Sequence, residues 1–147
     1  MTLSSRERAY EKHAWILLFV VGLFGISLGA GLLLQPLPKL GDITGLDWDE
    51  TSPQARVAVE HLKTISQWIF FFSIFTVVVS AIPYKKGEKW AWYAMWTLPV
   101  NLIIGAWRDL ELGITGFWPL WWPMLLLPII VSLLGLMVPY RKFFPSK

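Results

Sequence analysis

The ionisable residues that could do chemistry gather near the ends of apolar runs. They are Glu60 and His61 in one place, and Arg108, Asp109 and Glu111 in another. A histidine with carboxylates around it can bind a metal ion or transfer a proton. This group has one histidine and none of the spacings that mark a metal site. We therefore expect a polar cluster on the outer face of the protein, without a metal ion and without a catalytic residue.

A second group is aromatic and surrounds one amide. Asn101 is the strongly polar residue in the middle of its apolar run. It could form a hydrogen bond between two helices, or orient a ligand in an apolar cavity. Tryptophans at the ends of the runs could line that cavity, or anchor the protein at the membrane interfaces. The hypothesis of a ligand site names Trp96, Asn101, Trp107, Trp121 and Trp122.

Several kinds of chemistry are excluded by residue types that the sequence lacks. There is no cysteine, so disulfides, thiolate metal sites and cysteine nucleophiles are absent. The sequence has no nucleophile motif and no glycine-rich phosphate loop. The middle parts of the apolar runs carry no charge, whereas ion-coupled carriers and proton relays need one there. We expect no cofactor, and the sequence favours a protein without enzymatic activity over an enzyme.

These residues must be positioned by four long apolar runs. Of the 147 residues, 55% are hydrophobic and 16% are charged. A helix needs roughly 17–25 apolar residues to cross hydrocarbon, and a soluble chain of this size cannot bury four such runs. The sequence therefore predicts a single all-α membrane domain over residues 1–147, with the bilayer as its first partner. Its four transmembrane helices are expected at about 14–34, 65–82, 90–107 and 118–138.

Residues 35–64 form the one long connection, predicted as an acidic outer loop followed by a helix extension. Thr51-Ser52-Pro53-Gln54 is a helix start signal, and no breaker follows before Pro83. A helix from Pro53 to Ile82 would be about 45 Å long, which exceeds a hydrocarbon core of about 30 Å. The second span should therefore project from the membrane by several turns.

Small residues mark a helix-packing face on the first span. Gly22, Gly25 and Gly29 lie on one stripe, and the spacing of the last two lets helix backbones approach closely in lipid. The sequence does not say whether the packed partner belongs to the same chain.

Basic residues predict the orientation. Each of the two chain ends and the turn at Lys85, Lys86 and Lys89 carries three basic residues, whereas the outer connections are poor in them or acidic. The positive-inside rule then places both termini and this turn in the cytoplasm. The basic residues flank membrane spans and form no patch interleaved with aromatic residues, so nucleic acid is not an expected partner.

The same turn predicts an internal repeat. Glu88-Lys89-Trp90-Ala91-Trp92 repeats Glu11-Lys12-His13-Ala14-Trp15, and Pro83-Tyr84-Lys85-Lys86 is repeated by Pro139-Tyr140-Arg141-Lys142. We interpret the turn as the seam between two parallel copies of a two-helix unit, related by a pseudo-two-fold axis along the membrane normal. Convergence is the alternative, because Trp, Tyr and Lys gather at membrane interfaces in any case.

The run from Pro83 to Trp92 resembles one in small prokaryotic four-helix integral membrane proteins to which no mechanism is attached. The resemblance covers one turn and two helix ends. It implies a four-helix bundle in the prokaryotic cytoplasmic (inner) membrane, and it implies no activity and no site residues.

Three functions remain as hypotheses. The first is a non-catalytic accessory or scaffold subunit of a membrane complex, or a self-associating bundle, with other membrane subunits or its own copies as partners. The second is a binder of, or an enzyme acting on, an apolar lipid or isoprenoid in the tryptophan-lined cavity. The third is a small transporter, for which the sequence supplies no polar path.

Overall fold

The computed structural model describes residues 12–34, 53–111 and 118–145, and the side chains of these except 53–55, 58, 109–111 and 118–125. The described chain is helical and contains no strand, which confirms the all-α prediction. Its elements are α2 (Trp15–Leu34), α4 (Pro53–Val79), the π-helical turn η1 (Ser80–Tyr84), α5 (Lys89–Met95), α6 (Thr97–Glu111), α7 (Trp118–Met137) and α8 (Tyr140–Phe143).

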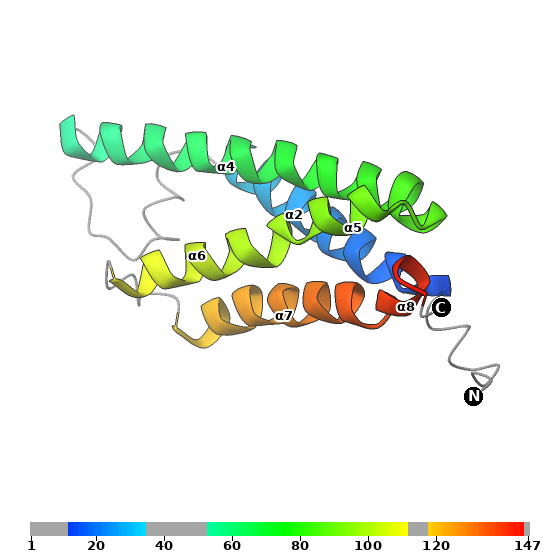
Figure 1. Ribbon diagram of the computed structural model, residues 1–147. Helices are drawn as coiled ribbons and strands as arrows, with labels where there is room; N and C mark the ends of the chain where they lie inside the picture. The colour runs from blue at the N-terminus through cyan, green and yellow to red at the C-terminus, as the bar shows by residue number, and fades with distance from the viewer. Residues whose placement is uncertain (1–11, 35–52, 112–117, 146–147) are drawn as a thin grey trace.

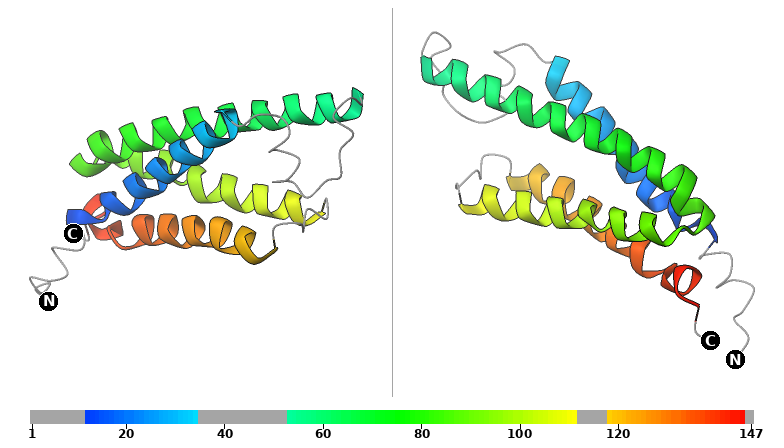
Figure 2. Two further views of the ribbon diagram at one scale, coloured as in Figure 1. Left: turned by 180° about the vertical axis from the view of Figure 1, so that it is seen from behind. Right: turned by 45° about the horizontal axis from the view of Figure 1, so that its top comes forward.

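The helices form two pairs that meet at one end of the bundle (Figure 1). α2 packs along α4, and α6 packs along α7, while α2 also contacts α7. The start of α2, the turn between η1 and α5, and α8 all lie at the same end, and the two views of Figure 2 agree on this. The first turns of α4 and α7 and the last turn of α6 lie at the opposite end.

Two helical segments are long and apolar enough to cross a membrane, namely Trp15–Leu34 and Val59–Tyr84. A third apolar stretch, Leu126–Met137, is shorter within the described side chains. The predicted third span at 90–107 is divided between α5 and α6. By length and composition, two of the four predicted spans therefore have support within the described residues.

Prolines explain where the helices change course. Pro99 has no N–H for the carbonyl of Met95, and its ring crowds that carbonyl, so the chain breaks at Trp96 between α5 and α6. Pro83 likewise cannot donate to the carbonyl of Val79, and α4 widens into a π-helical turn there instead of ending.

The glycine stripe of α2 faces α4 of the same chain. A Cβ atom added at Gly29 would lie 2.8 Å from the backbone nitrogen of Phe70, and one added at Gly22 would lie 2.7 Å from a methyl group of Val77. At Gly25 the added atom would overlap the hydroxyl of Ser73. The two backbones are therefore close enough that side chains larger than glycine do not fit between them.

α4 carries a row of buried small hydroxyl residues, and most of these hydroxyls donate within their own helix. Ser66 donates to the carbonyl of Leu62 at 2.7 Å, and Thr76 donates to the carbonyl of Phe72 at 2.9 Å. Buried hydroxyls satisfied in this way add little bulk and leave no polar atom unpaired. The row consists of Ser66, Ser73 and Thr76, and Ser80 at the start of η1 continues it.

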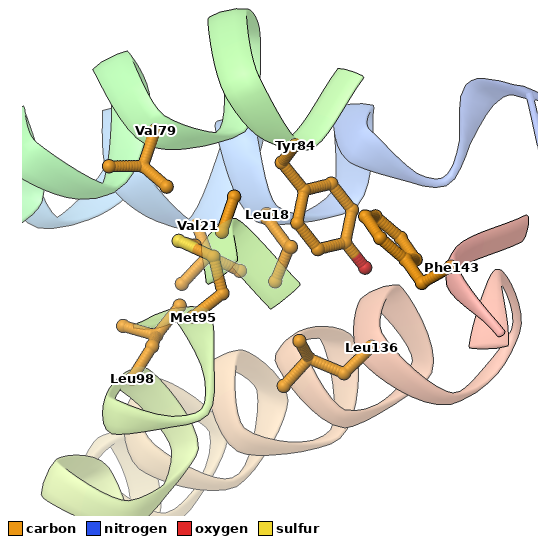
Figure 3. Close-up of a cluster of buried hydrophobic side chains, with 9 residues drawn as sticks. Leu18, Val21, Val79, Tyr84, Met95, Leu98, Leu136 and Phe143 are labelled. Carbon is orange, nitrogen blue, oxygen red and sulfur yellow. The ribbon is translucent and has the colours of Figure 1, made fainter. Parts of the chain in front are cut away.

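The apolar core lies near the end where the two pairs meet. Figure 3 shows side chains from every helix of the bundle pointing into this cluster, with Tyr84 beside Phe143. Its labelled members are Leu18, Val21, Val79, Tyr84, Met95, Leu98, Leu136 and Phe143. Burial at this end is what holds the second pair of helices against the first.

We predict that Gly29→Ala lowers the free energy of unfolding by about 1–3 kcal/mol, because backbone atoms of Phe70 cannot move aside for the new methyl group. Gly31→Ala is the matched control, since nothing lies within 4 Å of its added Cβ. It should be neutral or stabilising by up to about 1 kcal/mol. Thermal unfolding in detergent measures both, and equal effects would contradict the close approach of α2 and α4.

Candidate functional site

The seam turn, Pro83 to Trp92, reverses the chain through one glycine. Gly87 has φ of +85°, the left-handed conformation that side chains disfavour. Its N–H donates to the carbonyl of Tyr84 at 2.9 Å, and the N–H of Glu88 donates to the carbonyl of Pro83 at 3.1 Å. This pair of bonds is the Schellman motif that ends a helix, so the turn is locally defined by its own backbone.

Side chains of the seam turn satisfy the last carbonyls of α7. The carbonyl of Gly135 would normally accept from residue 139, but Pro139 has no N–H to give. The hydroxyl of Tyr84 donates to it instead, at 2.6 Å. One residue further on, Trp92 Nε1 donates to the carbonyl of Leu136 at 3.0 Å. Two orphan carbonyls at a helix C-terminus are thus capped from the other half of the chain.

The C-terminal segment in turn donates a hydrogen bond to a carbonyl of the seam turn. Lys142 Nζ donates to the carbonyl of Lys85 at 2.7 Å, in the last helical turn before the seam glycine. The stem of Lys142 passes so close to Gly87 that a Cβ added there would lie 3.3 Å from its Cε. Beside it, the rings of Tyr84 and Phe143 pack with centroids 4.7 Å apart. Each helix pair therefore caps the end of the other.

Aromatic rings surround these hydrogen bonds. Trp92 is central, with ring centroids 5.6 Å from Trp96, 5.8 Å from Tyr140 and 5.2 Å from Phe144. These edge-to-face contacts favour one arrangement of the rings and add to the energy of burial. They join α5, the break before α6 and the C-terminal segment into one unit.

Cations of the seam turn lie over rings from other segments. Lys85 Nζ is 4.7 Å from the ring centroid of Trp15, and Lys89 Nζ is 5.5 Å from that of Phe144. Both separations are within the range of cation–π attraction. The turn is in this way tied to the start of α2 and to the C-terminal segment.

This end of the molecule is strongly positive, and we refer to its six cations as the basic end. Five of them are exposed and Lys142 is half-buried. Glu88 is the acid that the structure describes beside them, and its carboxylate accepts from Trp90 Nε1. Within the described side chains none of the six cations forms a salt bridge. They are Lys12, Lys85, Lys86, Lys89, Arg141 and Lys142.

Of the residues predicted to line a ligand cavity, some are exposed and one packs against the core. Asn101 lies on an exposed face of α6, as does Trp107 with 64% of its surface exposed. Trp96 instead packs against the core, where its Nε1 is buried and has no hydrogen-bond partner among the described residues. Trp121 and Trp122 lie outside the described side chains. The tryptophan-lined cavity stays a prediction.

The outer polar cluster is described in part. Glu60, His61 and Arg108 are exposed, and the carboxylate of Glu60 lies 3.9 Å from Lys63 Nζ. The described residues bring no group of three potential metal ligands together. Asp109, Glu111 and the acidic loop lie outside the described residues or side chains.

The fold and its end cluster define an all-helical protein with two helices able to cross a membrane. Compared with known proteins, no family model, no curated protein and no solved structure matches the chain. The resemblance of the seam turn to small four-helix membrane proteins therefore rests on that turn alone.

Sequence reasoning missed the residues that do most at this end. The repeated motif includes Tyr84 and Lys142 but predicts no contacts for them, and no sequence pattern singles out Phe144. A signal was present, because Pro139 predicts a carbonyl without a partner at Gly135.

We predict that Tyr84→Phe lowers the free energy of unfolding by about 1–3 kcal/mol, because it leaves the carbonyl of Gly135 buried without a donor. Tyr140→Phe is the matched control. Tyr140 is the equivalent tyrosine of the repeat, and it is 51% exposed where Tyr84 is 1% exposed. Its loss should change stability by less than about 0.5 kcal/mol. Denaturation in detergent compares the two, and equal losses would disprove the capping role of Tyr84.

Proposed function

We propose that the chain is a four-span membrane protein with both termini cytoplasmic, acting as a non-catalytic accessory or scaffold subunit. It would associate within the bilayer with other membrane subunits or with copies of itself. The observation that carries this proposal is the position of Asn101 on an exposed and largely apolar face of α6.

The physical argument concerns the amide of Asn101. Its side chain makes no hydrogen bond to a described residue, and three of its exposed neighbours on α6 are large and apolar, while the hydroxyl of Thr97 donates to the carbonyl of Ala94. In hydrocarbon an unpaired amide costs several kcal/mol, so polar residues inside membranes pair across helix interfaces. Another helix that supplies a donor and an acceptor would relieve this cost. The three apolar neighbours are Val100, Ile103 and Ile104.

Two further features support a location in the bilayer. From Trp68 to Val78 the exposed side chains of α4 are all apolar, and Trp68 and Phe71 are the most exposed of them. Contiguous apolar surface of this kind is unfavourable in water and favourable against lipid or another membrane helix. The positive charge at the seam end supports a cytoplasmic position for that end.

The proposed duplication is supported by which positions are buried in the two halves. The sequence repeat aligns Trp15 with Trp92, and the two units then bury the same positions over the first turns of their first helices, whereas the buried Gly29 aligns with the half-buried Ala106. The equivalent buried pairs are Ala14 with Ala91, Leu18 with Met95, Val21 with Leu98 and Gly22 with Pro99.

The second helices of the two units agree as well. Aligning Pro83 with Pro139 pairs buried residues along α4 and α7, which is expected if both units pack in the same way about a pseudo-two-fold axis. These pairs are Ser73 with Ile129, Thr76 with Ser132, Val79 with Gly135, Ser80 with Leu136 and Pro83 with Pro139.

The association is tested with Asn101→Leu. Native mass spectrometry of the protein, extracted gently from its own membrane, should find a defined homo-oligomer or a co-purifying polypeptide. Asn101→Leu should weaken that association by about 3- to 20-fold, because an interhelical hydrogen bond in a membrane contributes roughly 0.6–1.7 kcal/mol. Val57→Leu, at a position of α4 that is 69% exposed and lies outside the predicted span, should leave it unaltered. A monomer for the unmodified protein would overturn the proposal.

One observation favours the second candidate, a binder of an apolar lipid or isoprenoid. Trp96 Nε1 is a buried donor that no described residue pairs with, at the break between α5 and α6, where an oxygen of a ligand headgroup would satisfy it.

This candidate predicts that an isoprenoid alcohol shifts the intrinsic fluorescence of the purified protein. Trp96→Phe should abolish the shift because it removes the responding ring, whereas Trp90→Phe should keep it because Trp90 is 53% exposed. The second candidate fails if the fluorescence of the unmodified protein does not respond, or if both variants lose the shift equally.

A further inference from the structure

The basic end carries more positive charge than the described chain compensates. Its six cations come from three separate segments, which the fold brings to one surface: the start of α2, the seam turn and α8 (Figure 1). Glu88 is the described acid beside them, and it already accepts from Trp90. A surface of this kind attracts anions, and the attraction increases where the charges are held close together.

Lys142 differs from the other five cations of the basic end. It is half-buried, and one of its three N–H donors is fixed on the carbonyl of Lys85. Its partial burial lowers its pKa, because water stabilises the ammonium less there than on the open surface. Two donors remain, and no described carboxylate lies within ion-pair distance. A partly desolvated cation in this situation is stabilised by an anion from outside the chain.

The rings beside these cations fit a membrane surface better than free solution. Lys85 and Lys89 extend over Trp15 and Phe144, and Trp92 completes the aromatic layer. Tryptophan and tyrosine rings favour the depth of lipid headgroups, with lysine ammonium groups just above them. Both apolar segments able to cross a membrane also have one end here.

We infer that the basic end is a binding site for the phosphate headgroup of an anionic phospholipid, with Lys142 as its anchoring cation. The inference rests on the membrane location in the proposed function, and it is independent of association through Asn101. Lys142 contacts the turn that carries Lys85 and Lys86, so a phosphate bound to its free donors would also meet exposed lysines of that turn. Basic surfaces between helices on the cytoplasmic side bind anionic headgroups in this way.

The test separates a built site from diffuse attraction by comparing two adjacent cations of equal charge. Purified protein in detergent is titrated with dioleoyl phosphatidylglycerol or dioleoyl phosphatidylcholine, and retained lipid is counted by native mass spectrometry. The unmodified protein should retain the anionic lipid several-fold more strongly. Lys142→Gln should reduce that retention about fivefold, and Arg141→Gln, at an exposed neighbour, less than about twofold. Lys142→Arg should preserve it.

Three results would overturn the inference. One is equal retention of the two lipids by the unmodified protein. Another is an equal loss in Lys142→Gln and Arg141→Gln, which would indicate diffuse charge. The third is displacement of the lipid by millimolar inorganic phosphate, which would assign the site to a free anion.

The salt dependence of lipid retention tests the inference on the unmodified protein alone. Retention of phosphatidylglycerol should fall as salt rises from 50 to 300 mM, because screening weakens exposed charges, and a salt-independent result would count against the site. The same spectra report the number of chains in each particle. If the protein is monomeric but still retains phosphatidylglycerol selectively, the proposed association is wrong and the lipid site still holds.

Discussion

The architecture depends on how two proline-interrupted helix ends satisfy their last carbonyls. Pro139 leaves the carbonyl of Gly135 without its normal donor, and the hydroxyl of Tyr84 takes that place at 2.6 Å. In return, Lys142 donates to the carbonyl of Lys85. A carbonyl buried without a donor costs about 1–3 kcal/mol, so the end of α7 depends on Tyr84 of the other helix pair, whereas the bond from Lys142 to Lys85 is exposed. The exchange explains why the core, the aromatic rings and the positive charge all gather there.

Away from this end, the two helix pairs differ in how closely their helices pack. α2 and α4 pack closely through glycines, whereas the helices of the second unit carry larger residues at the equivalent positions, such as Pro99 and Ile129. Under the proposed duplication, the two copies share most buried positions and differ in packing, and the buried Tyr84 of the first aligns with the exposed Tyr140 of the second. In the first unit the glycines of α2 pack against α4 of the same chain, and the exposed face of α6, with Asn101 on it, is the surface that we propose for a partner helix.

Much of this arrangement was predictable from local pattern. Hydrophobic run length predicted the helices, the Gly22, Gly25 and Gly29 stripe predicted a packing face, and the repeated Pro-Tyr-basic-basic motif marked the end where the units meet. The partners of Tyr84 and Lys142 were not predictable, because they lie some 50 or more residues away in sequence and depend on the turn at Gly87. The exposed position of Asn101 follows from the rotation of α6, which the break at Trp96 determines and no periodicity encodes.

The central claim is that the ends of both units lie on one side of a membrane, and cysteine accessibility tests it directly. The chain has no cysteine, so single substitutions give no background. Lys86→Cys, Arg141→Cys and Glu60→Cys all replace exposed side chains. With a membrane-impermeant maleimide, inverted vesicles should label the first two and not the third, and right-side-out vesicles should give the reverse. Labelling of Lys86→Cys and Arg141→Cys from opposite sides, or of all three from one side, would contradict the account.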